Sequence, residues 1–292
     1  METVLVLGGT GTVGTRLLDA IRQLKLDQRL KVVCTFRSEV SARKIESYGL
    51  ESVFVDLDEP QSLMTKVAGV TTIFLLKPYG LKMLNYAKSV VDAASSAGVR
   101  AIVNLSAFGP DCSSIDLLVW HRLVDSYVEC SGLSFTHLRP SFFMEGLAAR
   151  INFEERLVYG FSGNSNVPWV AAADIARTAV SIIGDVSPHA GKAYSLVSET
   201  VSVPQVATLL SELTGKPFKA VAMDEETAIK GLVARGREPI FARAIVEYGK
   251  LVPMFTANNE EGTIRSITGD AATSLRKFFE NYLLNKSSTT NA

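Results

Sequence analysis

Four glycines within residues 8–14, Gly-Gly-Thr-Gly-Thr-Val-Gly, form the first segment of the chain that could do chemistry. Gly8, Gly11 and Gly14 recur every three residues, and Gly9 completes the related G-x-G-x-x-G pattern. A turn without Cβ atoms lets backbone N–H groups approach a pyrophosphate at a helix N-terminus. An apolar segment precedes the turn and a helical one follows, so we predict a dinucleotide site rather than a tight turn that binds nothing. Its predicted contacts are Gly8, Thr10, Gly11, Thr12, Val13 and Gly14.

The end of the next expected strand distinguishes between the two nicotinamide cofactors. Proteins that bind NAD usually carry Asp or Glu about 20 residues after the turn, where the carboxylate accepts a hydrogen bond from the ribose 2′-hydroxyl. Arg37 and Ser38 stand at that place here, and Arg43 and Lys44 follow. A guanidinium suits a 2′-phosphate, whereas a carboxylate repels it. The sequence therefore favours NADP(H), the alternative being a solvated arginine at a strand end.

Two later strand ends carry further candidates for cofactor and substrate contacts. Asp56 could accept from the adenine amino group while Leu57 packs on the ring, or Asp56 could be an ordinary turn residue. Lys77 and Pro78 follow the fourth strand, beside the cofactor in this topology. Lys77 could meet phosphate or substrate and Tyr79 could line the pocket, the alternative being a surface lysine.

Strand-like and helix-like segments alternate through the first half of the chain. In 82–97 apolar residues recur at three- and four-residue spacings, and Gly98 is placed to end that helix. This alternation predicts a doubly wound parallel sheet with helices on both faces, an α/β Rossmann fold. The expected strands are 3–7, 31–36, 52–55, 72–76 and 101–105.

The regular alternation of strand-like and helix-like segments changes beyond about residue 140. There we expect a smaller, mostly helical substrate-binding region, although the order of its elements over 220–260 is open. The expected segments are a strand that breaks at Pro140 into an aromatic loop (138–147), an extended piece followed by a helix (167–183), a strand (192–199) and helices over 202–215 and 274–284. The expected domains are 1–150, completed by parts of 167–200, then 151–285, with a disordered tail over 286–292.

The composition excludes several classes of function. The chain has 292 residues, of which 47% are hydrophobic and 21% charged, as in globular proteins. Thirty basic residues balance thirty acidic ones, so nothing favours nucleic acid or anionic membrane as a partner. The three cysteines lie far apart without a metal-binding spacing, and no apolar stretch approaches the ~20 residues of a membrane span. We expect a cytoplasmic monomer or homodimer without a metal.

Several motifs resemble those of the NmrA-like group of atypical short-chain dehydrogenases/reductases. They are "NLSAFG" (104–109), "SGL-x-x-T-x-LRP-x-x-FMEG" (131–146), "DIA" (174–176) and "IRSITG" (264–269), together with the glycine turn and Arg37. The resemblance spans essentially the whole chain. It implies a Rossmann domain with a small C-terminal substrate domain. The group includes NADPH-dependent reductases, quinone and isoflavone-type reductases, redox sensors that bind NADP without turnover, and fungal natural-product enzymes that reduce iminium or enal groups.

One departure from the wider superfamily concerns the proton donor. Its typical enzymes use a Tyr-x-x-x-Lys pair, and the corresponding places here fall on Leu117 and His121. Leucine cannot transfer a proton. Asp125 follows His121 at i, i+4, so both face the same way on a helix. A carboxylate beside histidine stabilises imidazolium, which could donate a proton or orient the ribose, the alternative being a structural pair.

The remaining candidates surround the expected nicotinamide and substrate positions. Ser106 ends the fifth strand at the general place of the family's serine, the alternative being a strand-end hydroxyl bonded to backbone. A hydrophobic pocket wall is predicted from five apolar residues, with core packing as the alternative for the run 142–144. His137 is expected to be structural and Arg139 to brace backbone or a carboxylate. The five apolar residues are Phe108, Phe142, Phe143, Met144 and Trp169.

These observations lead to one hypothesis with two alternatives. The hypothesis is an NADPH-dependent reductase that delivers hydride to an imine/iminium, enal or quinone-like group of an apolar small molecule, in natural-product biosynthesis among other settings. An iminium already carries positive charge and accepts hydride without an acid, which makes leucine at 117 tolerable. The alternatives are a non-redox cyclising enzyme that uses NADP structurally, and an NADP-sensing regulator without turnover.

Overall fold

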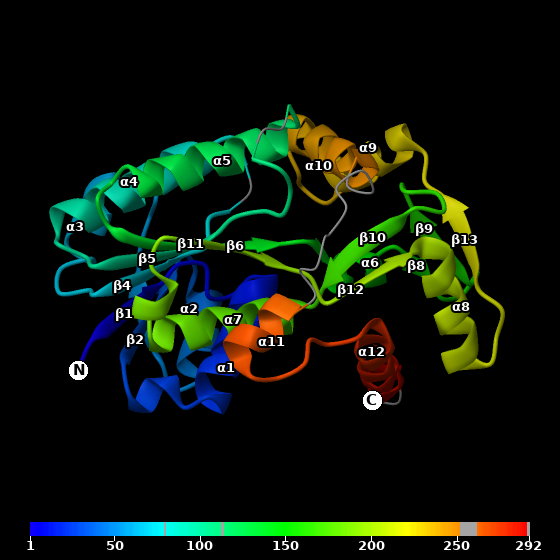
Figure 1. Cartoon of the computed structure of the whole chain (residues 1–292), viewed down its shortest axis with the longest axis horizontal. Coiled ribbons are helices and arrows are strands. Elements are labelled where there is room, and N and C mark those ends of the chain that lie inside the picture. The colour runs from blue at the N-terminus through cyan, green and yellow to red at the C-terminus, as the bar shows by residue number, and fades with distance from the viewer. Residues whose placement is uncertain (79, 112–113, 252–261, 291–292) are drawn as a thin grey trace. The chain divides into compact units, whose positions relative to one another are not determined.

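The computed structural model describes residues 1–78, 80–111, 114–251 and 262–290 (Figure 1). The chain forms two compact units. Unit 1 comprises Met1–Pro140 and Ile175–Ser195, and unit 2 comprises Ser141–Asp174 and Leu196–Ala292. The chain leaves unit 1 at Pro140 rather than at 150, and it returns within the segment that the sequence assigns to completing the first domain.

Unit 1 is built on a seven-stranded sheet of order β11-β6-β5-β4-β1-β2-β3. The strands from β3 to β6 all run parallel to their neighbours, so the predicted doubly wound fold class is confirmed. The order reverses at β1, and the crevice at the carboxyl ends of β1 and β4 is where such sheets bind ligands. The strands are β1 Thr3–Val6, β2 Lys31–Phe36, β3 Glu51–Phe54, β4 Thr72–Leu75, β5 Ala101–Leu105, β6 Ser134–Pro140 and β11 Lys192–Leu196.

Helices cover both faces of this sheet, with α3, α4 and α5 on one face and α1, α2 and the unit 1 part of α7 on the other (Figure 1). On the first face Leu5, Ile73 and Ile102 of the strands pack against Val90 of α4 and Val128 of α5. Burial of these apolar side chains fixes the strand ends that carry the polar candidates. The helices are α1 Thr12–Gln23, α2 Glu39–Glu46, α3 Pro60–Met64, α4 Met83–Ser96, α5 Asp116–Glu129 and α7 Ala172–Gly184, with 3-10 turns η1 Leu26–Gln28 and η2 Ser187–His189.

Unit 2 contains two three-stranded sheets, of order β12-β10-β7 and β13-β9-β8, beside its helices. Its strands are β7 Phe142–Phe143, β8 Ile151–Asn152, β9 Leu157–Gly160, β10 Asn166–Val170, β12 Glu199–Ser202 and β13 Lys219–Ala222. Its helices are α6 Met144–Ala148, α8 Val203–Thr214, α9 Glu225–Ala234, α10 Pro239–Leu251, α11 Thr263–Thr268 and α12 Leu275–Thr290.

Two expectations for unit 2 are wrong. The segment after Pro140 is not a loop but the strand β7 and the helix α6, because Phe142 and Phe143 pair with Trp169 and Val170 of the distant strand β10. The tail is helical as far as Thr290, since each residue added to an existing helix contributes a further hydrogen bond. Over the described ranges of the chain, none of the helices has the length and apolarity that crossing a membrane requires.

Candidate functional site

The glycines of the turn after β1 serve two different purposes. A Cβ on Gly14 would lie 2.1 Å from the Gly8 carbonyl oxygen and 2.6 Å from the Gly9 carbonyl carbon. Gly8 itself has φ +74°, and its Cβ would lie 2.7 Å from Leu76 Cδ2. By contrast, the nearest atom of the described residues to a Cβ on Gly11 would be the Gly8 oxygen, at 4.0 Å. The fold therefore requires glycine at 8 and 14, whereas at 11 glycine leaves room for something other than this chain.

The N-terminus of α1 adds a preference for an anion. Gly11 is the N-cap residue, without a side chain to cap the helix, and the first turn carries no acidic residue. The free N–H groups and the positive end of the helix dipole attract a phosphate group. Thr10 and Thr12 are at least partly exposed beside the turn, whereas the side chain of Val13 is buried. The turn therefore fits the pyrophosphate of a dinucleotide, with Val13 contributing only its backbone.

Arg37 and Asp56, which the sequence assigns to different parts of the cofactor, form one ion pair. Arg37 Nη2 lies 3.8 Å from Asp56 Oδ1 and 3.5 Å from Asp58 Oδ2, and the Arg37 side chain is 56% exposed. Exposed ion pairs of this kind contribute little to stability. A phosphate dianion, which forms stronger charge-assisted hydrogen bonds, can therefore compete for this guanidinium.

The polar start of α2 lies beside the glycine turn. Ser38 caps the helix, its Oγ accepting from Ser41 N at 3.3 Å, and Ser41 Oγ lies 3.3 Å from Thr10 Oγ1. Lys44 Nζ donates to Thr15 Oγ1 of α1 at 2.7 Å. Hydroxyl groups and a second cation thus join Arg37 at the place predicted for the 2′-phosphate.

The residues after β3 have roles within the fold. Asp56 Oδ1 accepts from the backbone N–H of Asp58 at 3.0 Å, which is the turn role named as the alternative for this aspartate. Leu57 is partly buried against the core of unit 1. Contacts of Asp56 and Leu57 with adenine remain predictions.

Lys77 is a buried residue rather than a surface lysine. Only 6% of it is exposed. Its Nζ donates to Asn104 Oδ1 at 3.0 Å and to the Leu105 carbonyl at 2.6 Å, which leaves one of its three N–H donors. Burial lowers the pKa of Lys77 to about 8, against an opposing effect of Asp125. Pro78 next to it is exposed, and Tyr79 lies outside the described residues.

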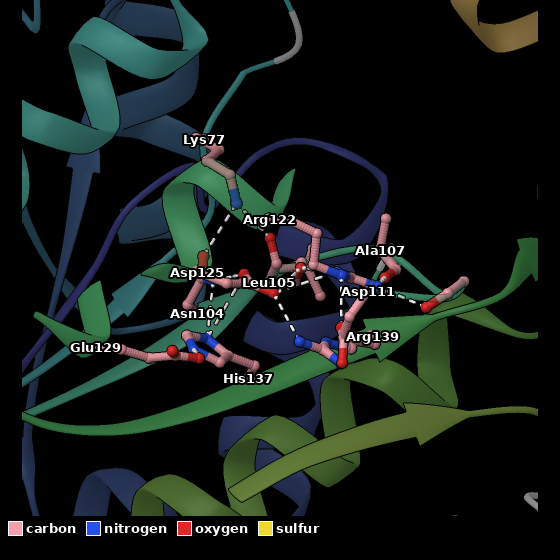
Figure 2. A network of polar contacts seen from close by, with 12 residues as sticks. Lys77, Asn104, Leu105, Ala107, Asp111, Arg122, Asp125, Glu129, His137 and Arg139 are labelled. Carbon is pink, nitrogen blue, oxygen red and sulfur yellow. Dashed lines mark hydrogen bonds and ion pairs between the residues drawn. The ribbon is translucent and has the colours of Figure 1, made fainter. Parts of the chain in front are cut away.

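Asp125 is the centre of a buried polar network that joins α5 to β5 and β6 (Figure 2). Its Oδ1 accepts from Asn104 Nδ2 at 2.8 Å. Its Oδ2 accepts from Ser106 Oγ at 2.9 Å, from Arg122 Nη1 at 3.2 Å and from Arg139 Nη2 at 3.2 Å. Only 2% of Asp125 is exposed, so these donors compensate a carboxylate that has lost its water.

The hydroxyl proton of Ser106 is committed to this network. Ser106 donates to Asp125 and accepts from Arg122 Nη1 at 3.2 Å, and it is 2% exposed. Both partners are side chains, so a hydrogen bond to backbone, the alternative role for this hydroxyl, does not describe it. The contacts of Ser106 suit a residue that positions the end of β5 better than one that gives up a proton.

The expectation that Asp125 holds His121 as imidazolium is wrong. His121 is buried, and its pKa lies well below the usual value of 6.5, first because of burial and then because of the positive charges of Lys77 and Arg122. The oxygens of Asp125 meanwhile accept from four other side chains. His121 is therefore a neutral imidazole at neutral pH and no ready proton donor.

Two arginines complete the network. Arg122 Nη2 donates to the carbonyls of Ala107 and Gly109 at 3.1 and 2.7 Å, which holds the chain after β5. Asp111 Oδ1 lies 2.9 Å from Arg122 Nε and 2.8 Å from Arg139 Nη1. The expectation that Arg139 braces a carboxylate is confirmed. Sequence reasoning missed Arg122, although its i, i+3 spacing to Asp125 was a visible signal.

His137 has a structural role, as predicted. Its Nδ1 lies 3.1 Å from Asn104 Nδ2 and its Nε2 lies 3.2 Å from Glu129 Oε1 (Figure 2). The ring stacks on Phe135, with centroids 4.9 Å apart. Burial lowers the pKa of His137 against the raising effects of Asp125 and Glu129. A neutral ring that accepts from Asn104 and donates to Glu129 satisfies both nitrogens.

The lowered pKa values predict how stability depends on pH. His121 and His137 bind protons less readily in the folded chain than in the unfolded chain. Their contribution to the free energy of unfolding is therefore full above pH 6.5 and is lost as pH falls below it. We expect the free energy of unfolding to fall by up to about 1.4 kcal/mol per pH unit for each histidine. Urea unfolding between pH 7.5 and 5.5 measures this slope, and His121→Gln should make it shallower. An unchanged slope in that variant would contradict a neutral His121.

Met144 and Trp169, both predicted to contact substrate, are buried in unit 2. Met144 is 0% exposed and Trp169 1% exposed, so neither presents a surface to a ligand. Trp169 Nε1 donates to the Val201 carbonyl of β12 at 3.1 Å. Core packing is the alternative named for Met144, and Trp169 lies on β10 between β7 and β12.

Phe142 and Phe143 are partly exposed in β7. The Phe142 ring stacks on Tyr248 of α10, with centroids 4.7 Å apart, and meets Trp169 edge-on at 6.0 Å. Phe108, in unit 1, is buried at 5% exposure. Phe142 and Phe143 therefore remain available as substrate contacts, whereas Phe108 is buried.

Comparison with known proteins agrees with this geometry. An NAD(P)H azoreductase of Xenophilus azovorans is 29% identical over 280 residues, which cover 94% of this chain and 96% of that protein. An agroclavine dehydrogenase of Claviceps fusiformis is 24% identical, covering 92% and 93%. The NADPH complex of an NADPH-dependent quinone oxidoreductase from Escherichia coli superposes with a TM-score of 0.84 at 20% identity, covering 96% and 99%. The profile of the NmrA-like family matches residues 1–283, and the chain belongs to that family.

Proposed function

We propose that the protein is an NADPH-dependent oxidoreductase that delivers hydride to an imine/iminium, enal or quinone-like group of a small molecule. The observation that carries the proposal is the turn at Gly11, where the chain leaves room beside an uncapped helix N-terminus. The relatives support it, because the azoreductase, the agroclavine dehydrogenase and the quinone oxidoreductase are all named for redox reactions on different acceptors.

The residues that would hold NADP(H) lie at successive strand ends of unit 1. The backbone around Gly11 would bind the pyrophosphate, and Arg37 with Ser38 the 2′-phosphate. Asp56 would accept from the adenine amino group. When bound, NADPH supplies a hydride.

The polar network decides which acceptors suit the site. Ser106 and Asp125 are bonded to each other and to two arginines, and they position the end of β5. His121, whose pKa burial and then the charges of Lys77 and Arg122 hold well below 6.5, is not imidazolium at neutral pH. An iminium needs no acid, because its positive charge already draws the hydride. An acceptor that does need a proton has Lys77 as its source, since only two of the three N–H groups of that ammonium have acceptors among the described residues.

This assignment predicts a pH dependence that differs between acceptors. The Lys77 ammonium is present below pH 8 and is lost above it. We expect the turnover of a quinone-like or enal acceptor to fall up to about tenfold per pH unit above pH 8, whereas a permanently charged N-alkyl iminium shows no such decline. Steady-state rates from pH 6.5 to 9.5 measure both. Persistence of the decline in Lys77→Met would contradict the role of this lysine.

The direct test of the proposed function combines binding with turnover. Calorimetry with NADP⁺ and NADPH measures cofactor binding, and loss of the nicotinamide absorbance measures reduction of imines, enals and quinones. Consumption of NADPH with any of these acceptors supports the proposal. Tight binding without consumption would favour the NADP-sensing regulator, and a product without absorbance change would favour the non-redox enzyme.

Arg37 sets the cofactor preference in this proposal. We expect Arg37→Asp to weaken NADPH binding about 100-fold, because a charge-assisted contact is replaced by repulsion, and to change NADH binding less than about threefold. Arg43→Asp is the matched control, since Arg43 is 79% exposed and pairs only with Glu39 among the described residues. Equal losses for both cofactors would remove the 2′-phosphate assignment.

A further inference from the structure

Arg150, in unit 2, holds its guanidinium against two aromatic rings. Its Cζ lies 5.7 Å from the centroid of Phe161 and 5.7 Å from that of Trp169. Its Nε donates to the Gly146 carbonyl at 3.2 Å. These distances fall within the range of cation–π attraction, so the rings and one carbonyl hold the cation in place.

This guanidinium has no acidic partner within the described part of the chain. Burial alone lowers the pKa of Arg150 to about 10, with no carboxylate acting in the opposite direction. Glu145, on the preceding helical turn, directs both of its oxygens to the backbone N–H of Ala172 at 3.1 Å. Arg150 remains charged at neutral pH, yet no carboxylate of the described residues balances its charge.

Two other partly buried arginines offer a contrast. Arg122 and Arg139 share two carboxylates, Asp111 and Asp125. Arg150 has five N–H donors like them, but only the one at Nε has an acceptor among the residues that the structure describes. The side chain keeps partial exposure, so a ligand can reach it.

We propose that Arg150 binds an anionic group, a carboxylate or sulfonate, carried by a planar aromatic substrate. An incoming anion would break no existing ion pair, and the planar guanidinium offers two parallel N–H donors to such a group. Phe142, partly exposed and stacked on Tyr248, belongs to the same aromatic cluster through Trp169. The inference rests on the proposed reduction of a small molecule and on the expectation from the sequence that the region beyond about residue 140 binds it, and it narrows the expected apolar substrate to an aromatic and anionic one.

The test compares two probes of the same shape and different charge. Naphthalene-2-sulfonate carries one negative charge and naphthalene-2-sulfonamide carries none. By calorimetry, without cofactor and again with saturating NADP⁺, we expect the wild-type chain to bind the sulfonate at least about tenfold more tightly. Equal affinities for the two probes would overturn the proposal. Because neither titration involves turnover, a failure of NADPH oxidation would leave this result intact.

Substitutions of Arg150 test whether this residue causes the preference for the sulfonate over the sulfonamide. Arg150→Gln should lower sulfonate affinity at least about tenfold and sulfonamide affinity less than twofold, while Arg150→Lys should keep part of the preference through its charge. Arg235→Gln, which removes an exposed arginine of the same unit, is the matched control and should change neither. A preference that survives in a folded Arg150→Gln chain would place the anion elsewhere, at the glycine turn for example. If Arg150→Gln fails to fold, Arg150→Lys still tests the proposal, because it should keep part of the preference for the sulfonate over the sulfonamide.

Discussion

Asp125→Ala is expected to lower the free energy of unfolding by about 3–5 kcal/mol, the range for removing one partner from a buried ion pair. The substitution would leave Arg122 and Arg139 facing each other with Asp111 as their remaining carboxylate. Their positive charges already disfavour one another, since Arg139 lowers the pKa of Arg122. It would also remove the acceptor of the Ser106 hydroxyl.

Urea unfolding at pH 7.5 measures this effect. Asp92→Ala is the control, because Asp92 is 48% exposed in an ion pair with Lys88 and its loss should amount to less than about 1 kcal/mol. Asp125→Asn keeps the shape without the charge and should fall between the two. If Asp125→Ala were as stable as Asp92→Ala, Asp111 alone would suffice for both arginines and Asp125 would not be the centre of the network.

Two glycine substitutions in one turn should have opposite consequences. Gly14→Ala places a Cβ 2.1 Å from the Gly8 carbonyl oxygen, and we expect it to destabilise the fold by more than about 3 kcal/mol, because backbone must move on both sides of the contact. Gly11→Ala meets no protein atom closer than 4.0 Å. It should change stability by less than about 0.5 kcal/mol and weaken NADPH binding at least about tenfold.

The comparison needs a stability measurement and a cofactor titration on each variant. Thermal unfolding without cofactor gives the first and calorimetry with NADPH the second. Each variant adds one methyl group to the same seven-residue segment, at a different position, so each controls for the other. Full NADPH affinity in Gly11→Ala would show that the space at Gly11 is not where the cofactor lies, and it would count against the proposed function.

The sequence predicts unit 1 well because its signals are local. Short β-branched strands alternate with amphipathic helices, and β2 and β5 begin and end where the pattern indicates. The glycine turn is local too, since spacing alone distinguishes it. Unit 2 is predicted poorly because its sheets join distant segments, as where Phe142 pairs with Trp169. A two-residue strand such as β7 has no alternation of its own to recognise.

The candidate site shows the same difference between residues with local signals in the sequence and residues whose properties depend on distant segments. The sequence assigns Gly11 and Arg37 to the cofactor, each from its place after a strand, and these contacts remain predictions. The charge state of His121 could not be predicted, because it depends on Lys77 after β4 and Arg122 on α5 as well as on burial. The i, i+4 spacing to Asp125 was misleading, since the carboxylate accepts from side chains of β5 and β6 instead. Pairings across four elements leave no spacing for sequence reasoning to detect.

The route of the chain through unit 1 has a consequence for its synthesis. Strand β11 lies beside β6 at the edge of the sheet, and Gly191 N donates to the Phe135 carbonyl at 2.8 Å, but this segment follows 34 residues that belong to unit 2. A nascent chain in which β1 to β6 have left the ribosome before β11 is made presents β6 as an open edge. Open apolar edges recruit strands from other molecules. Protection of β6 on the ribosome thus depends on Lys192–Leu196 being translated, and stalled or truncated chains should aggregate through that edge.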